Sequence, residues 1–306
     1  LDGRPMAWTV QNSSLLEICN SKNAKSSSSI EIYEGNLNFL YRNNGVTITD
    51  ICGKKWQSDL LIACDGANSQ ARKAAGLYTK YLVANQKSVV TRVNLNRLHN
   101  NIAFQRFLPD GPIALMPVRT QECALVWSLS NINANAIYDL SDTEFETQMI
   151  NVLGDAFKDI KVSSQRNIWT LKPSITRSMG KSGLILAGDS NHSIHPLAGM
   201  GFNLALADIA VICDCLINAR KNGLLFSHAS ILAEYRARRR VEVEAIIGAT
   251  QGLNRLFSYN SFQSKVLPSS LINIGLGIMD ILPMKKQISH IACGGVLTTA
   301  TLLSDI

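Results

Sequence analysis

The 306-residue sequence lacks the residue spacings that mark several common kinds of site. No Ser-His-Asp arrangement and no pair of catalytic carboxylates emerges, and the seven cysteines are scattered without metal-ligand spacing. Cys213 and Cys215 lie two apart on a predicted helix and therefore point to different faces. His192 and His195 lie three apart, but in a loop, so the sequence predicts no metal site. We interpret the cysteines as reduced thiols of a cytoplasmic protein.

Charged residues are also scarce, at 17%, whereas 46% of the residues are hydrophobic. A chain of this length and composition can form one large or two ordinary domains with a substantial core. Part of the net charge of +7 comes from one arginine cluster (Arg236, Arg238, Arg239 and Arg240). Such a cluster could face acidic lipid head groups or nucleic acid. Three nearby glutamates can pair with it (Glu234, Glu242 and Glu244), and no nucleic-acid motif accompanies it, so we expect a solvated helix face and no nucleic-acid partner.

The ends of the chain lack two familiar features. The sequence begins Leu1-Asp2-Gly3-Arg4, with neither an initiator methionine nor a signal-peptide pattern, and it looks like a fragment or a shortened copy. Val266 to Met284 is apolar but contains Pro268, Asn273 and Asp280, so it barely reaches the length of about 20 apolar residues that a membrane span requires. We expect an amphipathic helical segment that packs on the domain or touches a bilayer surface.

One stretch organises the chain. Leu184 to Ala187 reads as a short buried strand, which Gly188 and Asp189 follow, and Gly199 and Gly201 then lead into an apolar helix that begins near Phe202. A carboxylate at a strand end can hold a ribose-type hydroxyl, and a helix start aims backbone N–H groups at an anion or an electron-rich ring. The pattern indicates a nucleotide-cofactor site. The alternative is an ordinary strand followed by Gly-Asp, which many α/β proteins contain.

A second stretch has a similar design. Leu60 to Cys64 is an apolar strand, and Asp65-Gly66 follows it. Gly66 permits close backbone approach, and Ser69 can cap the next helix, whose first turn carries Arg72. Asp65 and Arg72 could also simply pair with each other and fix the loop.

These two strings resemble the internal motifs of the class A flavoprotein aromatic hydroxylases, D-G-x-x-S-x-x-R and G-D-x-x-H-x-x-x-P-x-x-G-x-G-x-N. Every fixed position of both motifs is present. His195-Pro196-Leu197-Ala198-Gly199, with Asn203-Leu204 and Asp208, looks more narrowly like the ubiquinone-biosynthesis hydroxylase branch. Further similarity to that branch lies in Tyr235-Arg236-x-x-Arg239-Arg240 and Gly252 to Ser258, so the likeness runs from about residue 8 to about 290.

The resemblance implies an FAD-dependent monooxygenase. In this family FAD, reduced by NAD(P)H or another electron donor, reacts with O2 to give a flavin hydroperoxide, which hydroxylates a phenol ring. For the ubiquinone branch, the substrate is a polyprenyl-phenol precursor, a protein complex for ubiquinone biosynthesis is a possible partner, and the enzyme is expected in the cytoplasm or peripherally at the inner membrane. No side chain is expected to act as the catalyst, because the flavin carries the chemistry.

The resemblance also assigns roles to the cofactor-binding residues. Asp189 would hold the ribityl or phosphate end of the flavin, and Gly188 would allow its approach. The run Pro196, Gly199, Met200, Gly201 and Phe202 would lie along the isoalloxazine, with Asn203 near the ring. Asp65, Gly66 and Arg72 would brace the pyrophosphate region, and Gln11 would contact the cofactor from a crossing segment. Ser190 and Asn191 stand where the family mostly has alanines, and we expect both to be tolerated.

The implied fold is α/β with an α+β insert: a Rossmann-like FAD domain of the aromatic-hydroxylase type, a β-sheet substrate domain and C-terminal helices. We predict that residues 1–80 and 173–225 form the FAD domain, 81–172 the substrate domain and 226–306 the helices. Strands are expected near 30–33, 37–40, 46–48, 87–95, 102–108, 113–118 and 123–129, and helices at 142–157, 204–219 and 230–257. Asn43-Asn44-Gly45 and Phe107 to Pro112 predict hairpin turns, and Leu115, Met116 and Trp127 could line the substrate pocket or be core.

One family element has no counterpart. The family opens with a βαβ unit that carries G-x-G-x-x-G and receives the adenosine and pyrophosphate of FAD, and no such string occurs here. The chain is therefore expected to lack the first part of its cofactor domain and to bind FAD weakly or not at all. This leaves open a non-catalytic homologue that serves as a scaffold or partner in a biosynthetic assembly. A related flavin reductase or tailoring hydroxylase is a third reading.

Overall fold

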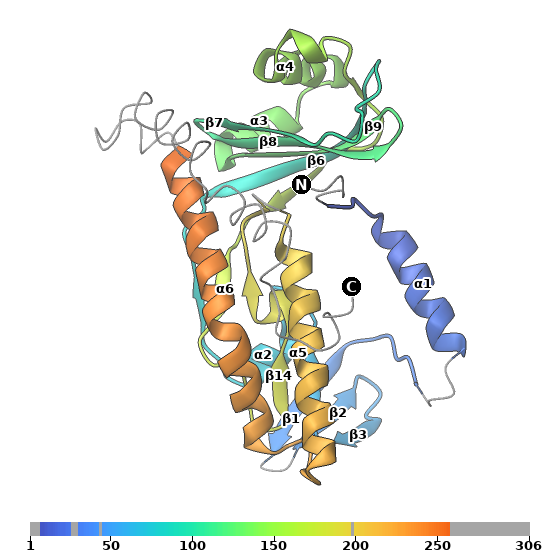
Figure 1. Cartoon of the computed structure of the whole chain (residues 1–306), viewed down its shortest axis with the longest axis vertical. Helices are drawn as coiled ribbons and strands as arrows, with labels where there is room; N and C mark the ends of the chain where they lie inside the picture. The colour runs from blue at the N-terminus through green and yellow to red at the C-terminus, as the bar shows by residue number, and fades with distance from the viewer. Residues whose placement is uncertain (1–6, 26–29, 43–44, 197–198, 258–306) are drawn as a thin grey trace. The chain divides into compact units, whose positions relative to one another are not determined.

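The computed structural model describes residues 7–25, 30–42, 45–196 and 199–257 (Figure 1). It contains two compact units, which are described separately. Asn85–Leu171 form the body of one unit, and Glu34–Ala84 with Lys172–Arg255 form the body of the other, which carries both sequence motifs. We call them the sheet unit and the motif unit.

The sheet unit is built on one antiparallel sheet with the strand order β10-β6-β9-β8-β7, with β11 also pairing with β6. The strands are β6 (Gln86–Asn94), β7 (Phe104–Leu108), β8 (Gly111–Arg119), β9 (Glu122–Ser130), β10 (Lys161–Val162) and β11 (Asn167–Thr170). Inward and outward residues alternate along β9, as period-2 patterning requires. The four strands expected between residues 87 and 129 are confirmed. The predicted hairpin at Phe107–Pro112 is also confirmed, since Leu108 pairs with Gly111.

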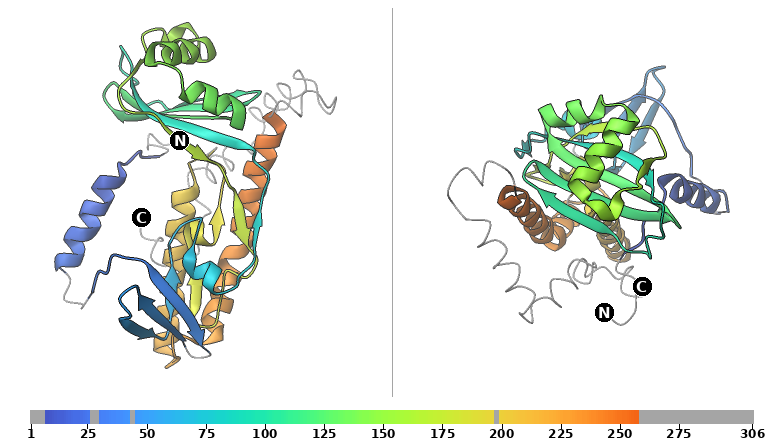
Figure 2. Two further views of the ribbon diagram at one scale, coloured as in Figure 1. Left: turned by 180° about the vertical axis from the view of Figure 1, so that it is seen from behind. Right: turned by 90° about the horizontal axis from the view of Figure 1, so that it is seen from above.

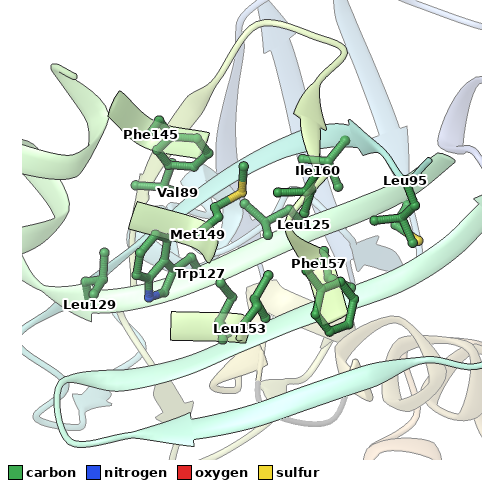
Figure 3. Packing of buried hydrophobic residues seen from close by; sticks show 14 of the residues in the cluster. Val89, Leu95, Leu125, Trp127, Leu129, Phe145, Met149, Leu153, Phe157 and Ile160 are labelled. Atoms are coloured by element: carbon green, nitrogen blue, oxygen red, sulfur yellow. The ribbon is translucent and has the colours of Figure 1, made fainter. Parts of the chain in front are cut away.

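Two helices cover the core of this sheet: α3 (Asn131–Tyr138) and α4 (Asp142–Leu153), followed by a 3-10 turn, η1 (Asp155–Phe157). The sequence predicts an N-cap at Ser141 or Asp142 for α4, and Ser141 provides it, in a capping box with Glu144. Figure 3 shows side chains of α4, among them Phe145 and Met149, packed over strand residues. The rings of Trp127 and Phe145 lie 6.0 Å apart, centroid to centroid. Trp127 and Leu115 are thus core residues of this unit, at 3% and 2% exposure.

The motif unit contains three small sheets, with strand orders β1-β2-β3, β13-β14-β4 and β15-β12-β5. Their strands are β1 (Leu37–Arg42), β2 (Gly45–Asp50), β3 (Lys55–Ser58), β4 (Leu61–Ala63), β5 (Thr79–Tyr81), β12 (Ser174–Thr176), β13 (Gly180–Lys181), β14 (Leu184–Leu186) and β15 (His192–Ser193). β1 and β2 are antiparallel with Arg42 opposite Gly45, which confirms the predicted hairpin. β4 and β14, the strands of the two motifs, are parallel.

Three helices complete the motif unit: the short α2 (Gln70–Ala74), α5 (Gly201–Lys221) and α6 (Ala229–Phe257), with a 3-10 turn, η2 (Gly188–Ser190). Figures 1 and 2 show α5 and α6 next to each other over β14. Their contact buries Val211 and Cys215 of α5 against Ile231 and Tyr235 of α6. Among the described residues α5 alone is long and apolar enough to cross a membrane, with mean hydropathy 1.7, but half of that window is buried inside the protein.

Two local predictions were wrong. The apolar spacing between Met6 and Asn20 predicts a helix with Asn12 or Ser13 as its N-cap, followed by a polar loop from Lys22. α1 (Asn12–Lys25) begins at the predicted cap, but it continues through Lys25. Its apolar residues are largely exposed, for example Leu16 at 56%, so burial of an apolar face does not fix its limits. Ile30–Tyr33 was expected as a strand and forms none. The apolar segment predicted at 266–284 lies outside the described residues.

Candidate functional site

The two sequence motifs meet at one edge of a sheet. β4 and β14 run parallel, with Leu61 opposite Leu184 and Ala63 opposite Leu186. Their carboxyl ends therefore lie side by side, and the Ala187 N–H extends the pairing by donating to the Ala63 carbonyl at 3.0 Å. Asp65 and Asp189 each follow one of these strands within a few residues. Loops at the carboxyl ends of parallel strands are where α/β proteins bind ligands.

Arg72 joins the two motif loops. Its guanidinium is 2% exposed and donates two hydrogen bonds of 2.6 Å, one to the Ser190 carbonyl and one to the Ala67 carbonyl. Within the described residues it forms no ion pair with Asp65, so the pairing that the sequence suggested is not made. Asp65 instead accepts the Ala71 N–H at 3.1 Å through Oδ2. Arg72 therefore holds the second loop against the first through backbone oxygens.

The turn between Asp65 and Arg72 has the predicted local chemistry. Gly66 has φ +78°, a backbone region that side chains disfavour. Its carbonyl accepts the Ser69 N–H at 3.0 Å, and the Ser69 hydroxyl caps α2 by accepting the Arg72 N–H at 3.0 Å. This cap fixes the start of the helix that carries Arg72.

Ser190 is fully satisfied in the second loop. Its hydroxyl lies 2.6 Å from the Ala63 carbonyl and 2.8 Å from the Ala187 carbonyl, and it also accepts the Ala187 N–H at 3.1 Å. The side chain thus bridges β4 and the residue after β14. The expected tolerance of serine here has a structural basis in these contacts.

A buried charge network holds the Gly188 backbone from the other side. Asp208 of α5 accepts hydrogen bonds from the Gly188 N–H at 2.9 Å, from His192 Nε2 at 2.7 Å and from Arg239 Nε of α6 at 2.8 Å. Asp208 and Arg239 have no solvent exposure, and Arg239 also contacts Glu242. Burial alone would raise the pKa of Asp208, but the bonds and charges of His192 and Arg239 outweigh burial and lower it.

Sequence reasoning did not place Asp208 and Arg239 in the site. Both residues stand in the strings that resemble the ubiquinone branch, but nothing in those strings showed that the two side chains meet. They lie 31 residues apart on different helices. The expected glutamate partners of the arginine cluster are observed: Arg238 pairs with Glu234, Arg239 with Glu242 and Arg240 with Glu244.

Two glycines of the second motif have left-handed backbones. Gly188 has φ +57°, and a Cβ added there would lie 3.0 Å from the Ala205 Cβ of α5. Gly199 has φ +60°, and an added Cβ would meet no atom of the described residues within 4 Å. Gly188 is therefore required by close packing of the loop on α5, and Gly199 leaves open space beside the helix start. Gly201 lacks a positive φ, and a Cβ there would make ordinary contact with Ile194.

The helix start that follows offers unpaired donors. No side chain of the described residues caps α5, and its first turn contains no acidic residue. The first intrahelical bond there joins the Leu204 N–H to the Met200 carbonyl at 3.0 Å, which leaves the N–H groups before Leu204 available to a ligand. Phe202 is 57% exposed and Asn203 is exposed beside it, whereas Met200 is only 8% exposed and packs with Leu204.

Asp189 presents an available carboxylate. It is exposed and makes no hydrogen bond or ion pair with any described residue. Partial burial of its carboxyl raises the pKa of Asp189, and His192 works in the opposite direction. A free carboxylate, an open glycine at Gly199 and unpaired helix N–H groups form a donor and acceptor set that fits a flavin nucleotide. Pro196, also exposed, completes this surface.

Two remaining predictions concern His195 and Gln11. His195 has no solvent exposure, and desolvation lowers its pKa to about 4, so its imidazole is neutral in the folded protein. No cluster of potential metal ligands occurs in the described ranges. Gln11 is grouped with the sheet unit and not with the motif unit. There its carbonyl accepts the N–H groups of Ser14 and Leu15 at the start of α1. Its predicted role toward a cofactor stays a prediction.

Comparison with known proteins places the chain in a family. The family model described as "FAD binding domain" matches residues 38–250. Ubiquinone hydroxylase UbiL of Rhodospirillum rubrum is 28% identical, over 95% of this chain and 67% of that protein. The human mitochondrial ubiquinone biosynthesis monooxygenase COQ6 is 32% identical, over 70% of this chain and 52% of that protein. The chain thus spans about half to two thirds of the length of these curated relatives.

A solved structure shows the same fold. The flavin-dependent brominase Bmp2 aligns with a TM-score of 0.75 over 95% of this chain and 72% of its own, at 12% identity. The OxyS anhydrotetracycline hydroxylase from Streptomyces rimosus aligns with a TM-score of 0.68 over 93% of this chain and 56% of its own, at 17% identity, so a hydroxylase and a brominase share this architecture. The architecture alone does not choose the reaction.

Proposed function

The chain belongs to the family of FAD-binding domains, and from this premise we propose that it is the cofactor- and substrate-binding portion of an FAD-dependent monooxygenase of ubiquinone biosynthesis. The substrate would be a polyprenyl-phenol precursor that becomes hydroxylated on its aromatic ring. Relatives with names for this activity support the proposal. A brominase-like reaction is the second candidate, which the fold permits and the relatives by sequence do not favour.

The observation that carries the proposal is the parallel pairing of β4 and β14. This pairing brings the two motif loops to one edge of the sheet, directly before the uncapped start of α5. In this arrangement Asp189 would accept hydrogen bonds from hydroxyls of the ribityl chain. The N–H groups of Gly201, Phe202 and Asn203 would face the electron-rich edge of the ring. The Asp65–Gly66 turn would support the pyrophosphate region.

The bound flavin would supply the redox chemistry and the activation of O2. The chain itself would then supply position and charge. Arg72 and Ser190 would hold the two loops at a fixed separation. The Asp208 carboxylate would fix the Gly188 backbone by accepting the Gly188 N–H. His195, neutral in the folded protein, would add no positive charge beside the ring-binding segment. A polyprenyl tail is lipid-soluble, so the proposal includes peripheral contact with the inner membrane and with other proteins of the pathway.

The test is a flavin titration. The chain is purified as printed and with any residues that its gene encodes before Leu1, and FAD binding is followed by absorbance and by quenching of flavin fluorescence. Asp189→Ala should weaken FAD binding about 10- to 100-fold, because a hydrogen bond to a charged group contributes about 1.5–3 kcal/mol. Asp159→Ala, at an exposed aspartate of the sheet unit, should leave the affinity unchanged.

Turnover then separates the candidate reactions. A protein that binds FAD is supplied with NADH or NADPH, O2 and a short-chain prenylphenol, and the products are identified by mass spectrometry. Addition of one oxygen atom to the ring supports the hydroxylase. FAD binding without NAD(P)H oxidation would contradict the monooxygenase, and absence of FAD binding in every version would favour a non-catalytic scaffold.

A further inference from the structure

The motif unit contains a cavity that none of the predicted cofactor residues lines. It has a volume of about 470 Å³ and lies between β5, β12 and the second half of α6. Asn191 of the second motif loop reaches it from the side. Cavities of 300–1,000 Å³ are typical of small-molecule sites.

The buried Asn191 side chain has few polar neighbours among the described residues. The residue is 1% exposed, and neither its amide nitrogen nor its amide oxygen makes a hydrogen bond. Its backbone is fully used, because the Asn191 N–H donates to Gly188 and the Asn191 carbonyl accepts from Thr176. The Tyr235 hydroxyl donates its proton to the Leu186 carbonyl at 3.0 Å. The Asn191 amide approaches this hydroxyl closely enough for a side-chain hydrogen bond that acts to lower the pKa of Tyr235, but it finds no further polar group among the described residues. A buried amide with so few partners is rare, and a ligand in the cavity would satisfy it.

The charged side chains around the cavity favour an anion. Lys80, Arg177 and Arg240 carry positive charge, and Glu244 is the one carboxylate in the lining. Arg240 pairs with Glu244 at 2.8 Å. Lys80 and Arg177 have no carboxylate partner among the described residues, and both are exposed at the rim. Two cations therefore remain available to a negatively charged group.

The deeper wall of the cavity is apolar. Val243 and Ile247 of α6 are 1% and 8% exposed, and Met179 is 3% exposed. Leu82 adds a further aliphatic side chain next to β5. An apolar wall beneath a cationic rim matches a molecule with a charged head and a hydrocarbon chain.

We propose that this cavity binds an anionic amphiphile, with a carboxylate or phosphate head on Lys80, Arg177 and the Asn191 amide and an alkyl chain against Val243 and Ile247. The site is separate from the residues proposed to hold FAD. Because Asn191 and Asp189 belong to one loop, the ligand would contact the segment that carries the cofactor carboxylate.

Gly248 offers a way to close the cavity without disturbing the fold. It lines the cavity within α6, and a Cβ added there would meet no atom of the described part of the chain within 4 Å. Gly248→Leu therefore places a side chain in the cavity and removes an unfavourable helix glycine. Gly252→Leu is the matched control, since Gly252 lies in the same helix, has the same open surroundings and does not line the cavity.

The experiment is isothermal titration calorimetry on the chain without added FAD, with probes kept below their critical micelle concentrations. The probes are sodium dodecanoate, dodecyl phosphate, 1-dodecanol and inorganic phosphate. We expect the two anionic amphiphiles to bind at least about tenfold more tightly than dodecanol or phosphate, with affinity that falls as salt rises. Binding of only one of the two anions also supports the site and identifies its head group.

The variants decide the location. Gly248→Leu should weaken dodecanoate binding at least about tenfold, and Gly252→Leu should not change it. Asn191→Leu should raise the melting temperature, since it removes an unsatisfied amide, and should weaken binding. Equal affinity for dodecanol and dodecanoate, equal affinity of Gly248→Leu and the parent, or no binding of either anion would overturn the proposal. Because FAD is absent, these outcomes are independent of the monooxygenase proposal.

Discussion

The sheet unit and the motif unit bury different chemistry. Within residues 85–171, all of which the structure describes, Glu146 is the one acidic or basic side chain with under 9% exposure, and it binds the surface Lys161 at 2.7 Å. The motif unit buries Arg72, Asp208 and Arg239 at 2% exposure or less. Figure 3 shows the apolar packing that organises the first unit.

The difference follows from what each unit holds in place. Apolar packing fixes a sheet well, because the strands already satisfy their own backbone groups. The motif loops instead leave carbonyls and N–H groups unpaired at the sheet edge. Arg72 and Asp208 supply partners for these groups, on Ser190, Ala67 and Gly188. Directional buried charges thus position the loops. They also make the stability of the motif unit sensitive to substitution and to pH.

Removal of the buried cation Arg239 is the strongest test of this difference between the two units. Arg239→Met should lower the free energy of unfolding by about 3–5 kcal/mol, because it leaves Asp208 buried beside fewer positive partners. Arg240→Met removes an exposed ion pair with Glu244 and should change the free energy of unfolding by less than about 1 kcal/mol. Urea denaturation followed by circular dichroism measures both. A loss at Arg239 no larger than that at Arg240 would mean that the network does not stabilise the unit.

Acid should weaken the motif unit through His195. The unfolded chain takes up a proton near pH 6.5, whereas the buried imidazole does so near pH 4, so the unfolded state binds more protons in between. Stability is therefore lost as pH falls from 6.5 toward 4, by roughly 3 kcal/mol from this group. The free energy of unfolding at several pH values measures the slope. His195→Gln should flatten the slope, and an unchanged slope would assign the effect to other groups.

The sequence predicted most of the elements but few of the contacts between distant ones. The cap of α4 was predicted at Ser141 or Asp142, because the signal for a cap is local, and Ser141 provides it. α3 was missed, since Asn131–Tyr138 contains three asparagines with poor helix propensity, and the helix is stabilised by the Ser130 cap and by burial of Ala134.

The same distinction holds in the candidate site. The motif strings predicted two strand ends with carboxylates, and these strands are paired. The sequence suggested that Arg72 could pair with Asp65, but its guanidinium binds the Ala67 carbonyl and the carbonyl of Ser190, 118 residues away in the chain. Its predicted role toward a cofactor stays a prediction. A backbone oxygen has no side-chain signature, so no spacing could have revealed these contacts with carbonyls. The Asp208–Arg239 pair was hidden for a similar reason, since it depends on how two helices pack.

A smaller effect should separate the two left-handed glycines of the second motif. Gly188→Ala combines left-handed backbone strain with a 3.0 Å approach to Ala205, and should cost about 2–3 kcal/mol. Gly199→Ala has the strain without the approach and should cost about 1 kcal/mol. Thermal unfolding compares the two variants. Equal losses would indicate that α5 shifts to accommodate the added methyl group.

The smallest effect on stability is expected in the sheet unit, where a capping side chain instead of a buried charge fixes the start of α4. Ser141→Ala removes the hydroxyl that accepts the Glu144 N–H at the start of α4 and should cost about 1 kcal/mol. Thr143→Ala, in the first turn of the same helix, is the control and should change stability by a few tenths of a kcal/mol. Because Phe145 and Met149 still anchor α4 in the core, the sheet unit should keep its near-ultraviolet circular dichroism. Loss of that signal in Ser141→Ala would show that the unit depends on a polar contact as strongly as the motif unit does on Arg239.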